Sequence, residues 1–257
     1  MSGDGAQAMW GPVLTWYAEH GRDFPWRDTR DPYAILVSEV MLQQTQVSSV
    51  LPRYLRWLEL WPTAEALAAA EVADVIREWD GMGYNRRAVN LHRCAAAVAE
   101  RGGFPREQAE LRALPGIGPY TAAAIACFAF GEQVSAPDTN ARRVLERSGR
   151  PDLQPPPGRA YEWNQALFDL GREICIARRP RCDACPLAAD CPSRGMTFAP
   201  LRKQSRFEGS FRQRRSALLK RLTAEGRIPV GDADDEALAA LVADGLAAVD
   251  EGTATLP

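Results

Sequence analysis

The sequence predicts an all-α fold, and three observations support that class. Apolar residues recur at helical spacing along the chain, first in residues 10–20. The connections between such segments are short, and no strand-like alternation appears before residue 225. With 257 residues, of which 46% are hydrophobic, the chain can bury the cores of two domains and a small appendage.

Composition restricts the classes of function. No apolar run approaches the length of about 18 residues that a membrane span needs, and the first residues lack the order of a signal peptide. We therefore expect a cytoplasmic protein with no membrane contact, in which the six cysteines form no disulfides. Only two histidines, His20 and His92, are present, which argues against histidine-centred hydrolysis.

The first two elements are a docking helix over residues 10–20 and an apolar helix over residues 32–48. Asp31 and Pro32 suit the N-cap and first position of the second helix. Glu39 is the charged residue within that apolar helix, and two interpretations remain open. It lies either on a solvent-facing polar stripe with the glutamines or among apolar neighbours as a functional carboxyl group.

A helix and a break at Pro62 are expected within residues 51–67. Further helices are expected over residues 72–79 and 88–100, and a glycine-rich turn follows at Gly116 and Gly118. Both glycines can take positive φ and leave backbone N–H groups accessible at a helix N-terminus, as a phosphate-binding turn requires. A plain tight connection between two helices is the alternative. Asp138 then begins a helix over residues 139–147, either as an N-cap alone or with a further role.

The four clustered cysteines give the clearest spacing signal. They lie within one short run and consist of Cys175, Cys182, Cys185 and Cys191. Four thiolates so close together in a reducing compartment indicate metal ligands. One compact run fits a [4Fe-4S] cluster better than zinc, whose ligands usually come as two separated pairs.

In the last segment of the chain, the basic and the acidic residues lie in separate stretches. A basic helix around residues 205–222 is followed by an acidic helix at about 235–244 and a weakly alternating stretch over residues 246–256. This order predicts a small winged-helix-like tail. Its arginines either contact DNA phosphates or pair with the acidic helix, and both readings are open.

Several motifs resemble one family. They are SEVMLQQTQV, GMGYNRRAVNLH, LPGIGPYTAAAI, PDTNARRVLER and the cysteine run. Together they look like the helix-hairpin-helix DNA glycosylases related to endonuclease III, and most like the MutY adenine glycosylases among them. The resemblance implies a six-helix domain over residues 27–133 and an iron-sulfur domain made of residues 1–26 and 134–197. The tail, residues 205–257, would be a third domain, and we expect no MutT-like domain in it.

The resemblance also implies a mechanism. Breaking an N-glycosidic bond requires an acid for the leaving base and an anion beneath the developing sugar cation. Glu39 would protonate adenine at N7, Asp138 would stabilise the cation, and Asn140 would bond near the same sugar. Tyr120 stands where bifunctional relatives have a nucleophilic lysine, so a monofunctional enzyme is expected in which this tyrosine holds Glu39. A packed core aromatic is the alternative for Tyr120.

The expected partner is double-stranded DNA with a mispaired or damaged base, which must leave the stack. By resemblance, the residues that contact DNA or the bases are Arg27, Leu42, Gln43, Gln44, Tyr84, Gly116 and Gly118. Adenine opposite 8-oxoguanine or guanine is the expected substrate. A thymine or uracil mismatch glycosylase and a non-catalytic iron-sulfur DNA-binding protein are the alternatives.

Overall fold

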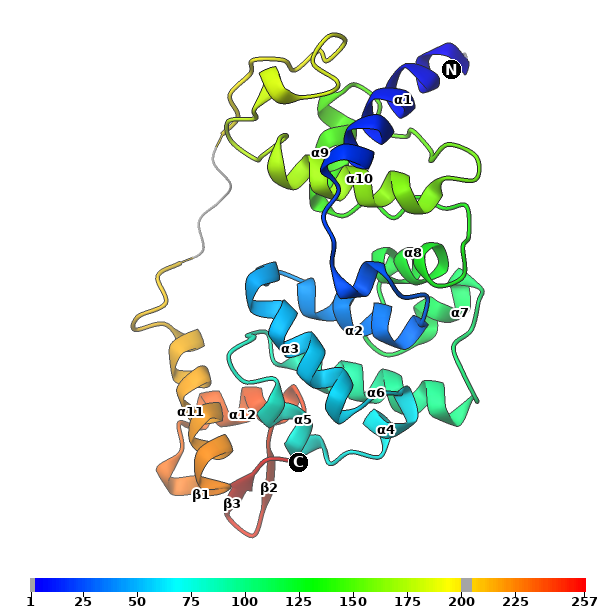
Figure 1. Ribbon diagram of the computed structural model, residues 1–257. Coiled ribbons are helices and arrows are strands. Elements are labelled where there is room, and N and C mark those ends of the chain that lie inside the picture. The colour runs from blue at the N-terminus through cyan, green and yellow to red at the C-terminus, as the bar shows by residue number, and fades with distance from the viewer. Residues whose placement is uncertain (1–2, 200–204) are drawn as a thin grey trace. The chain divides into compact units, whose positions relative to one another are not determined.

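The computed structural model describes residues 3–199 and 205–257, and helices dominate both ranges (Figure 1). The all-α prediction is therefore confirmed. The chain divides into two compact units. The first contains Arg106–Arg112 and the described residues of Met1–Ile35 and Gly118–Lys203, and the second contains Leu36–Pro105, Ala113–Ile117 and the described residues of Gln204–Pro257.

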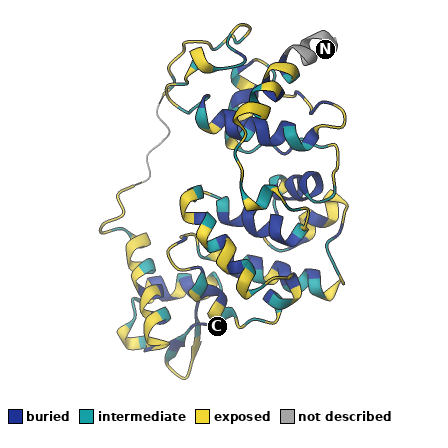
Figure 2. Ribbon diagram, viewed as in Figure 1, coloured by how far each residue is buried: buried dark blue, intermediate teal, exposed yellow. Residues whose placement is uncertain are grey.

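Helices are the only regular secondary structure among the described residues of the first unit. Its α-helices are α1 (Gly3–His20), the start of α2 (Pro32–Leu42), most of α7 (Gln108–Ala113), α8 (Pro119–Phe128), α9 (Thr139–Arg147) and α10 (Ala160–Glu173). Two single-turn 3-10 helices, Pro25–Arg27 and Cys182–Ala184, lie in its connections. Helices α1, α9 and α10 share a core that contains Met9, Val13, Leu145, Trp163 and Leu167. Helix α8 is buried along most of its length (Figure 2).

The second unit holds the remaining helices. They are α3 (Val47–Leu60), α4 (Ala64–Ala68), α5 (Val72–Glu78), α6 (Arg86–Glu100), α11 (Phe211–Glu225) and α12 (Asp235–Ala243). Trp57 and Trp79 are fully buried and meet edge to face, with ring centroids 5.5 Å apart, which adds specific geometry to the apolar burial.

The connection between α2 and α3 differs from the expectation. The helix expected over residues 32–48 ends at Leu42, because Gln44 adopts a left-handed backbone with φ of 55°. The next helix, α3, begins at Val47, earlier than the expected start at Leu51, and ends at Leu60, before the expected break at Pro62. Both corrections come from one break in the chain at Gln43 and Gln44.

The C-terminal module, residues 205–257, combines α11 and α12 with three short strands. These are β1 (Arg227–Pro229), β2 (Ala248–Asp250) and β3 (Thr253–Thr255), which form an antiparallel sheet in the order β1-β3-β2. The expected helices and hairpin are present, and the hairpin turns at Glu251 and Gly252. Strand β1 was not predicted, because a strand of three residues is too short to show an alternation of apolar and polar residues in the sequence.

The module packs on the helices of its own unit. Leu218, Leu222 and Leu241 share one hydrophobic core with Ile76 of α5 and Val89 of α6. This shared core makes the module part of the second unit.

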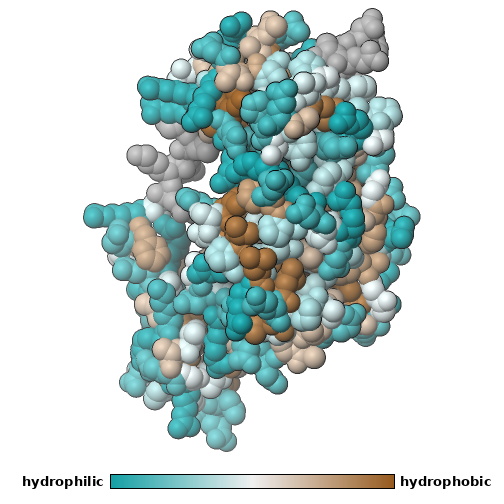
Figure 3. Space-filling model, in the orientation of Figure 1, coloured by the Kyte–Doolittle hydropathy of each residue, from teal (hydrophilic) through white to brown (hydrophobic). Residues whose placement is uncertain are grey.

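The charges of α11 are largely paired within the module. Arg214 contacts Asp234 at 2.7 Å and Glu236 at 2.6 Å. Arg221 pairs with Glu225 at 3.0 Å. The visible surface over the module is mostly hydrophilic (Figure 3). In the described ranges, no helix combines the length and apolar character that crossing a bilayer requires.

Candidate active site

Glu39 is buried in the middle of α2. Asp31 caps this helix, because its carboxylate oxygens accept hydrogen bonds from the backbone N–H groups of Tyr33 and Ala34 at 3.1 and 3.2 Å. Glu39 is only 8% exposed, and Leu36 one turn earlier is fully buried. The solvent-facing interpretation of Glu39 is therefore wrong. An apolar setting of this kind favours the protonated form of a carboxyl group, as a general acid requires.

Asp138 is the N-cap of α9 and lies half-buried. One carboxylate oxygen accepts a hydrogen bond from the backbone N–H of Ala141 at 2.7 Å. The other accepts a hydrogen bond from the side-chain amide of Asn140 at 2.9 Å. These two hydrogen bonds hold the carboxylate in place at the N-terminal end of the helix. The predicted pair of Asp138 and Asn140 thus lies together.

Arg143 connects this pair to the first cysteine of the cluster run. Its guanidinium donates to the side-chain oxygen of Asn140 at 2.9 Å and to the carbonyl of Gly171 at 2.6 Å. Its Nε donates to the carbonyl of Cys175 at 2.7 Å. Burial lowers the pKa of Arg143. Gly171 permits the close packing, since a Cβ there would lie 2.7 Å from the carbonyl oxygen of Asn140.

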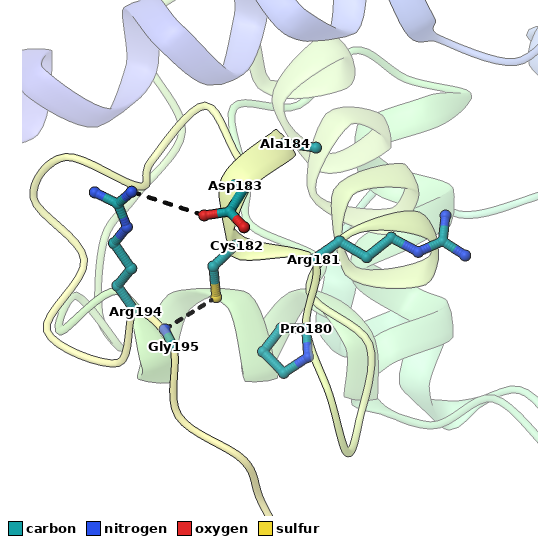
Figure 4. A pocket seen from close by; sticks show the side chains of 7 residues that line it. All are labelled: Pro180, Arg181, Cys182, Asp183, Ala184, Arg194 and Gly195. Atoms are coloured by element: carbon teal, nitrogen blue, oxygen red, sulfur yellow. Dashed lines mark hydrogen bonds and ion pairs between the residues drawn. The ribbon is translucent and has the colours of Figure 1, made fainter.

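The four cysteines of the run are all half-buried in one loop after α10. Arg147 lies beside Cys175, with its Nη1 3.7 Å from the sulfur. The backbone N–H of Gly195 donates to the sulfur of Cys182 at 3.4 Å (Figure 4). Burial raises the pKa of the Cys185 thiol, and the other three thiols add to that rise. The Cys185 sulfur therefore interacts electrostatically with the other three sulfurs.

This arrangement suits an iron-sulfur cluster. N–H donors at Cys175 and Cys182 stabilise negative sulfur, which cluster ligation requires. Among residues 3–199 and 205–257, no three His, Cys, Asp or Glu side chains are grouped to hold a metal ion. Four cysteines from one short run are a ligand set that such clusters use. Beside Cys182 the loop also encloses a hollow of about 430 Å³, bordered by Arg181 and Arg194 (Figure 4).

Cys94 and Cys127 are structural, as expected. Both are buried, and burial raises the pKa of Cys94 to about 12 and that of Cys127 to about 11. Neutral buried thiols are poor nucleophiles and poor ligands.

The glycine-rich turn before α8 corrects one expectation. Gly116 takes positive φ, at 76°, and a Cβ there would lie 2.8 Å from the Cβ of Asn90. Gly118 does not, because it is the extended N-cap of α8. Tyr120 follows in the first turn of α8, half-buried, with its ring centroid 6.3 Å from that of Phe168.

The residues expected to contact bases lie in two segments. Leu42 and Gln43 are half-buried and Gln44 is exposed, directly after α2. Tyr84, in the turn before α6, is 51% exposed and has φ of 46°. Both segments contact the side chain of Arg87, which sequence reasoning did not single out.

Arg27 is tied to a buried acid that sequence reasoning missed. The Arg27 guanidinium makes two hydrogen bonds to the carboxylate of Asp169, at 2.8 and 2.9 Å. The Asp169 side chain is fully buried, and Arg22 also donates to it, at 3.3 Å from Nε. Hydrogen bonding to Asp169 raises the pKa of Arg27 against the opposing effect of burial. An acid within the apolar stretch ALFDLG was the available signal, of the same kind as Glu39.

Comparisons with known proteins show the family to which this chain belongs. A family model described as "HhH-GPD superfamily base excision DNA repair protein" matches residues 37–168, and one described as "Iron-sulfur binding domain of endonuclease III" matches residues 175–191. The chain belongs to the HhH-GPD superfamily of base excision DNA repair proteins. The second match confirms the prediction of an iron-sulfur cofactor at the four cysteines.

Two curated relatives and one solved structure cover most of the chain. An adenine DNA glycosylase of Mycolicibacterium smegmatis is 42% identical, over 91% of this chain and 90% of the relative. One of Mycobacterium tuberculosis is 40% identical, over 91% of this chain and 88% of the relative. The structure of a thermostable thymine-DNA glycosylase is 30% identical, with a TM-score of 0.69, over 74% of this chain and 96% of that one.

Proposed function

We propose that this protein is a monofunctional adenine DNA glycosylase that hydrolyses the N-glycosidic bond of adenine mispaired with 8-oxoguanine or guanine. Relatives that carry the name adenine DNA glycosylase match nearly the whole chain at 40 to 42% identity. The observation that carries the proposal is the contrast between two carboxyl groups, the buried Glu39 and the helix-capping Asp138. Glycosidic hydrolysis needs two carboxyl groups in different protonation states, and different surroundings provide them.

Glu39 acts as the general acid. Its burial among apolar residues of α2 favours a protonated carboxyl group that can deliver its proton to N7 of the departing adenine. Protonation makes the base a better leaving group, so the bond to the sugar weakens before water attacks.

Asp138 stabilises the oxocarbenium-like sugar. Its carboxylate accepts two hydrogen bonds, from Ala141 and Asn140, which fix its orientation. Asn140 is hydrogen-bonded in turn by Arg143, which orients the amide toward Asp138. Tyr120 takes the place of a nucleophilic lysine, so no Schiff base forms and the strand stays intact.

The substrate is double-stranded DNA with a mispaired base. The residues that enter the base stack or touch the opposing base are Leu42, Gln43, Gln44 and Tyr84. Arg27 lies near the flipped adenine. The turn at Gly116 and Gly118 contacts phosphate. The enzyme acts as a cytoplasmic, nucleoid-associated monomer. Its domains are residues 27–133, residues 1–26 with 134–197, and residues 205–257.

A thymine or uracil mismatch glycosylase is the second candidate. It is favoured by the likeness to the thermostable thymine-DNA glycosylase, whose sequence is 30% identical to that of this chain. The identity of the released base separates the two functions.

The test is single-turnover base release by Asp138→Asn and Glu39→Gln. Asparagine caps helices as well as aspartate does, so Asp138→Asn removes the charge while keeping α9. We expect adenine release to fall by about 100-fold or more in each variant. Asp152→Asn, an exposed acid in a loop of the same unit, is the matched control and should keep the full rate. Adenine release by Asp138→Asn at the unmodified rate would overturn the site.

A further inference from the structure

Arg87 joins two separate segments of the second unit through one guanidinium. The first segment is the glutamine loop, residues 43–46, with the end of α2 before it. The second is the tyrosine turn, residues 81–84. Arg87 itself lies in the first turn of α6, just after the tyrosine turn.

The contacts to each segment are short and direct. Nη1 donates to the carbonyls of Val40 at 2.7 Å and Gln43 at 2.8 Å. Nη2 donates to the carbonyls of Met82 and Gly83, both at 3.0 Å. Further acceptors on the first segment are the carbonyl of Met41 and the hydroxyl of Thr45, each at 3.2 Å.

Two of these carbonyls, those of Val40 and Met41, lie in the last turn of α2. The last carbonyls of α2 have no N–H group one turn ahead to bond, because the helix stops at Leu42. A guanidinium presents several donors in a fixed plane, so one side chain can satisfy both segments at once. Burial lowers the pKa of Arg87 to about 10, so it stays charged at neutral pH.

The two segments also hold unusual backbone conformations. Gln44 has φ of 55° and Tyr84 has φ of 46°, and both are non-glycine residues in the left-handed region. Such a conformation is strained for a residue with a side chain, so it persists only where surrounding contacts enforce it. Arg87 bonds to a direct chain neighbour of each strained residue, at Gln43 and Gly83.

Aromatic contacts complete the arrangement on the side of the tyrosine turn. The Arg87 guanidinium lies 5.1 Å from the ring centroid of Trp79 and 5.7 Å from that of Tyr84. The indole N–H of Trp79 donates to the carbonyl of Gly83 at 3.1 Å, which Arg87 also binds. The ring of Tyr84 therefore has a charged support while half of its surface stays open.

We propose that Arg87 is a positioning residue that locks the glutamine loop and the tyrosine turn into one preformed surface for reading the base opposite the substrate base. This inference rests on the proposed function. The Arg87 side chain bonds to protein carbonyls and acts on DNA through Gln43, Gln44 and Tyr84. Preorganisation of this kind lowers the cost of ordering both segments when DNA binds.

The test compares three variants. Arg87→Lys keeps the charge, but one ammonium group cannot span both segments. Thr45→Val removes one acceptor, at 3.2 Å, and should cause a smaller change in the same direction. Arg86→Lys is the matched control from the next position of α6, since Arg86 is 64% exposed and faces Asp244 at 3.5 Å.

The first readout is single-turnover adenine release opposite 8-oxoguanine and opposite guanine, per active molecule. We expect Arg87→Lys to lower the faster rate by about tenfold or more and to bring the ratio of the two rates closer to one. Arg86→Lys should leave both rates unchanged. A purely structural role would reduce the active fraction and leave the ratio as it was, which would overturn the proposal.

The second readout separates this proposal from the proposed function. Amide hydrogen exchange reports the order of each segment without any reaction. Arg87→Lys should speed exchange at residues 43–46 and 81–84 together, and leave α10 unchanged. Failure of the unmodified protein to release adenine would count against the proposed function, and the exchange result would still decide the role of Arg87. Unchanged exchange in both segments would overturn it.

Discussion

Arg143 donates a hydrogen bond from Nε to the backbone carbonyl of Cys175, over 2.7 Å. The same guanidinium reaches Asn140, which in turn bonds to the carboxylate of Asp138. A continuous series of hydrogen bonds therefore runs from the first cysteine of the cluster loop to the proposed catalytic carboxylate. Disorder in the cluster loop would therefore disturb the position of the Asp138 carboxylate.

Replacing Arg143 with glutamine should slow base release. The variant loses the bonds to Asn140, Gly171 and Cys175, so the Asn140 amide is no longer fixed toward Asp138. We expect a rate about tenfold or more below normal, with iron per chain unchanged because all four cysteines remain. Arg142→Gln, an exposed neighbour on α9, serves as the control. An unchanged rate in Arg143→Gln would show that the series of hydrogen bonds is irrelevant to chemistry.

Replacing Cys182 with alanine should abolish cluster binding and unfold much of the first unit. Binding of a structural metal group contributes folding free energy, and the cluster loop has little apolar core of its own. Iron content and thermal unfolding measure the effect, with Cys94→Ala as the control for loss of a buried thiol elsewhere. Soluble Cys182→Ala protein that lacks iron and still binds DNA would contradict this account.

Replacing Asp169 with asparagine should destabilise the protein strongly. Asp169 is fully buried and receives Arg22 and Arg27, so its loss leaves a buried guanidinium without its anion. We expect the free energy of unfolding in urea to fall by about 3 to 5 kcal/mol. Glu173→Gln removes a partner of Arg22 whose side chain is 37% exposed, and should cost below about 1 kcal/mol. Equal small losses for both would refute the importance of the buried pair.

The paired charges of the C-terminal module predict a weak role for α11 in DNA binding. Arg214 is already neutralised by Asp234 and Glu236, so it releases few counterions from DNA. We expect Arg214→Ala to leave unchanged the slope of log Kd against log salt concentration. A slope reduced by about one would indicate a phosphate contact instead.

Leu222→Ala, by contrast, should destabilise the second unit, because Leu222 is fully buried in the shared core.

Local chemistry explains what the sequence allowed us to predict. Helix α9 has the predicted bounds of residues 139–147, since its N-cap and apolar spacing lie within the segment itself. The spacing of the cysteines likewise indicated the iron-sulfur cofactor, which the family match confirms. The winged-helix-like tail followed from helical spacing and from the Glu251-Gly252 turn.

Long-range contacts explain what the sequence did not allow. The end of α2 at Leu42 depends on Arg87, more than forty positions away, whose bonds stabilise the break. The partner of Arg27 lies 142 positions away at Asp169. No local pattern encodes such pairings. An isolated acid in an apolar helix marked Glu39 as unusual, and the same signal at Asp169 was missed.

The most direct test of the central claim is single-turnover base release from four matched duplexes. They carry adenine opposite 8-oxoguanine, adenine opposite guanine, thymine opposite guanine and uracil opposite guanine. The account predicts release of adenine from the first two duplexes, with the strand intact at the abasic site, and no release of thymine or uracil. Release of a pyrimidine, or of no base at all, would contradict it.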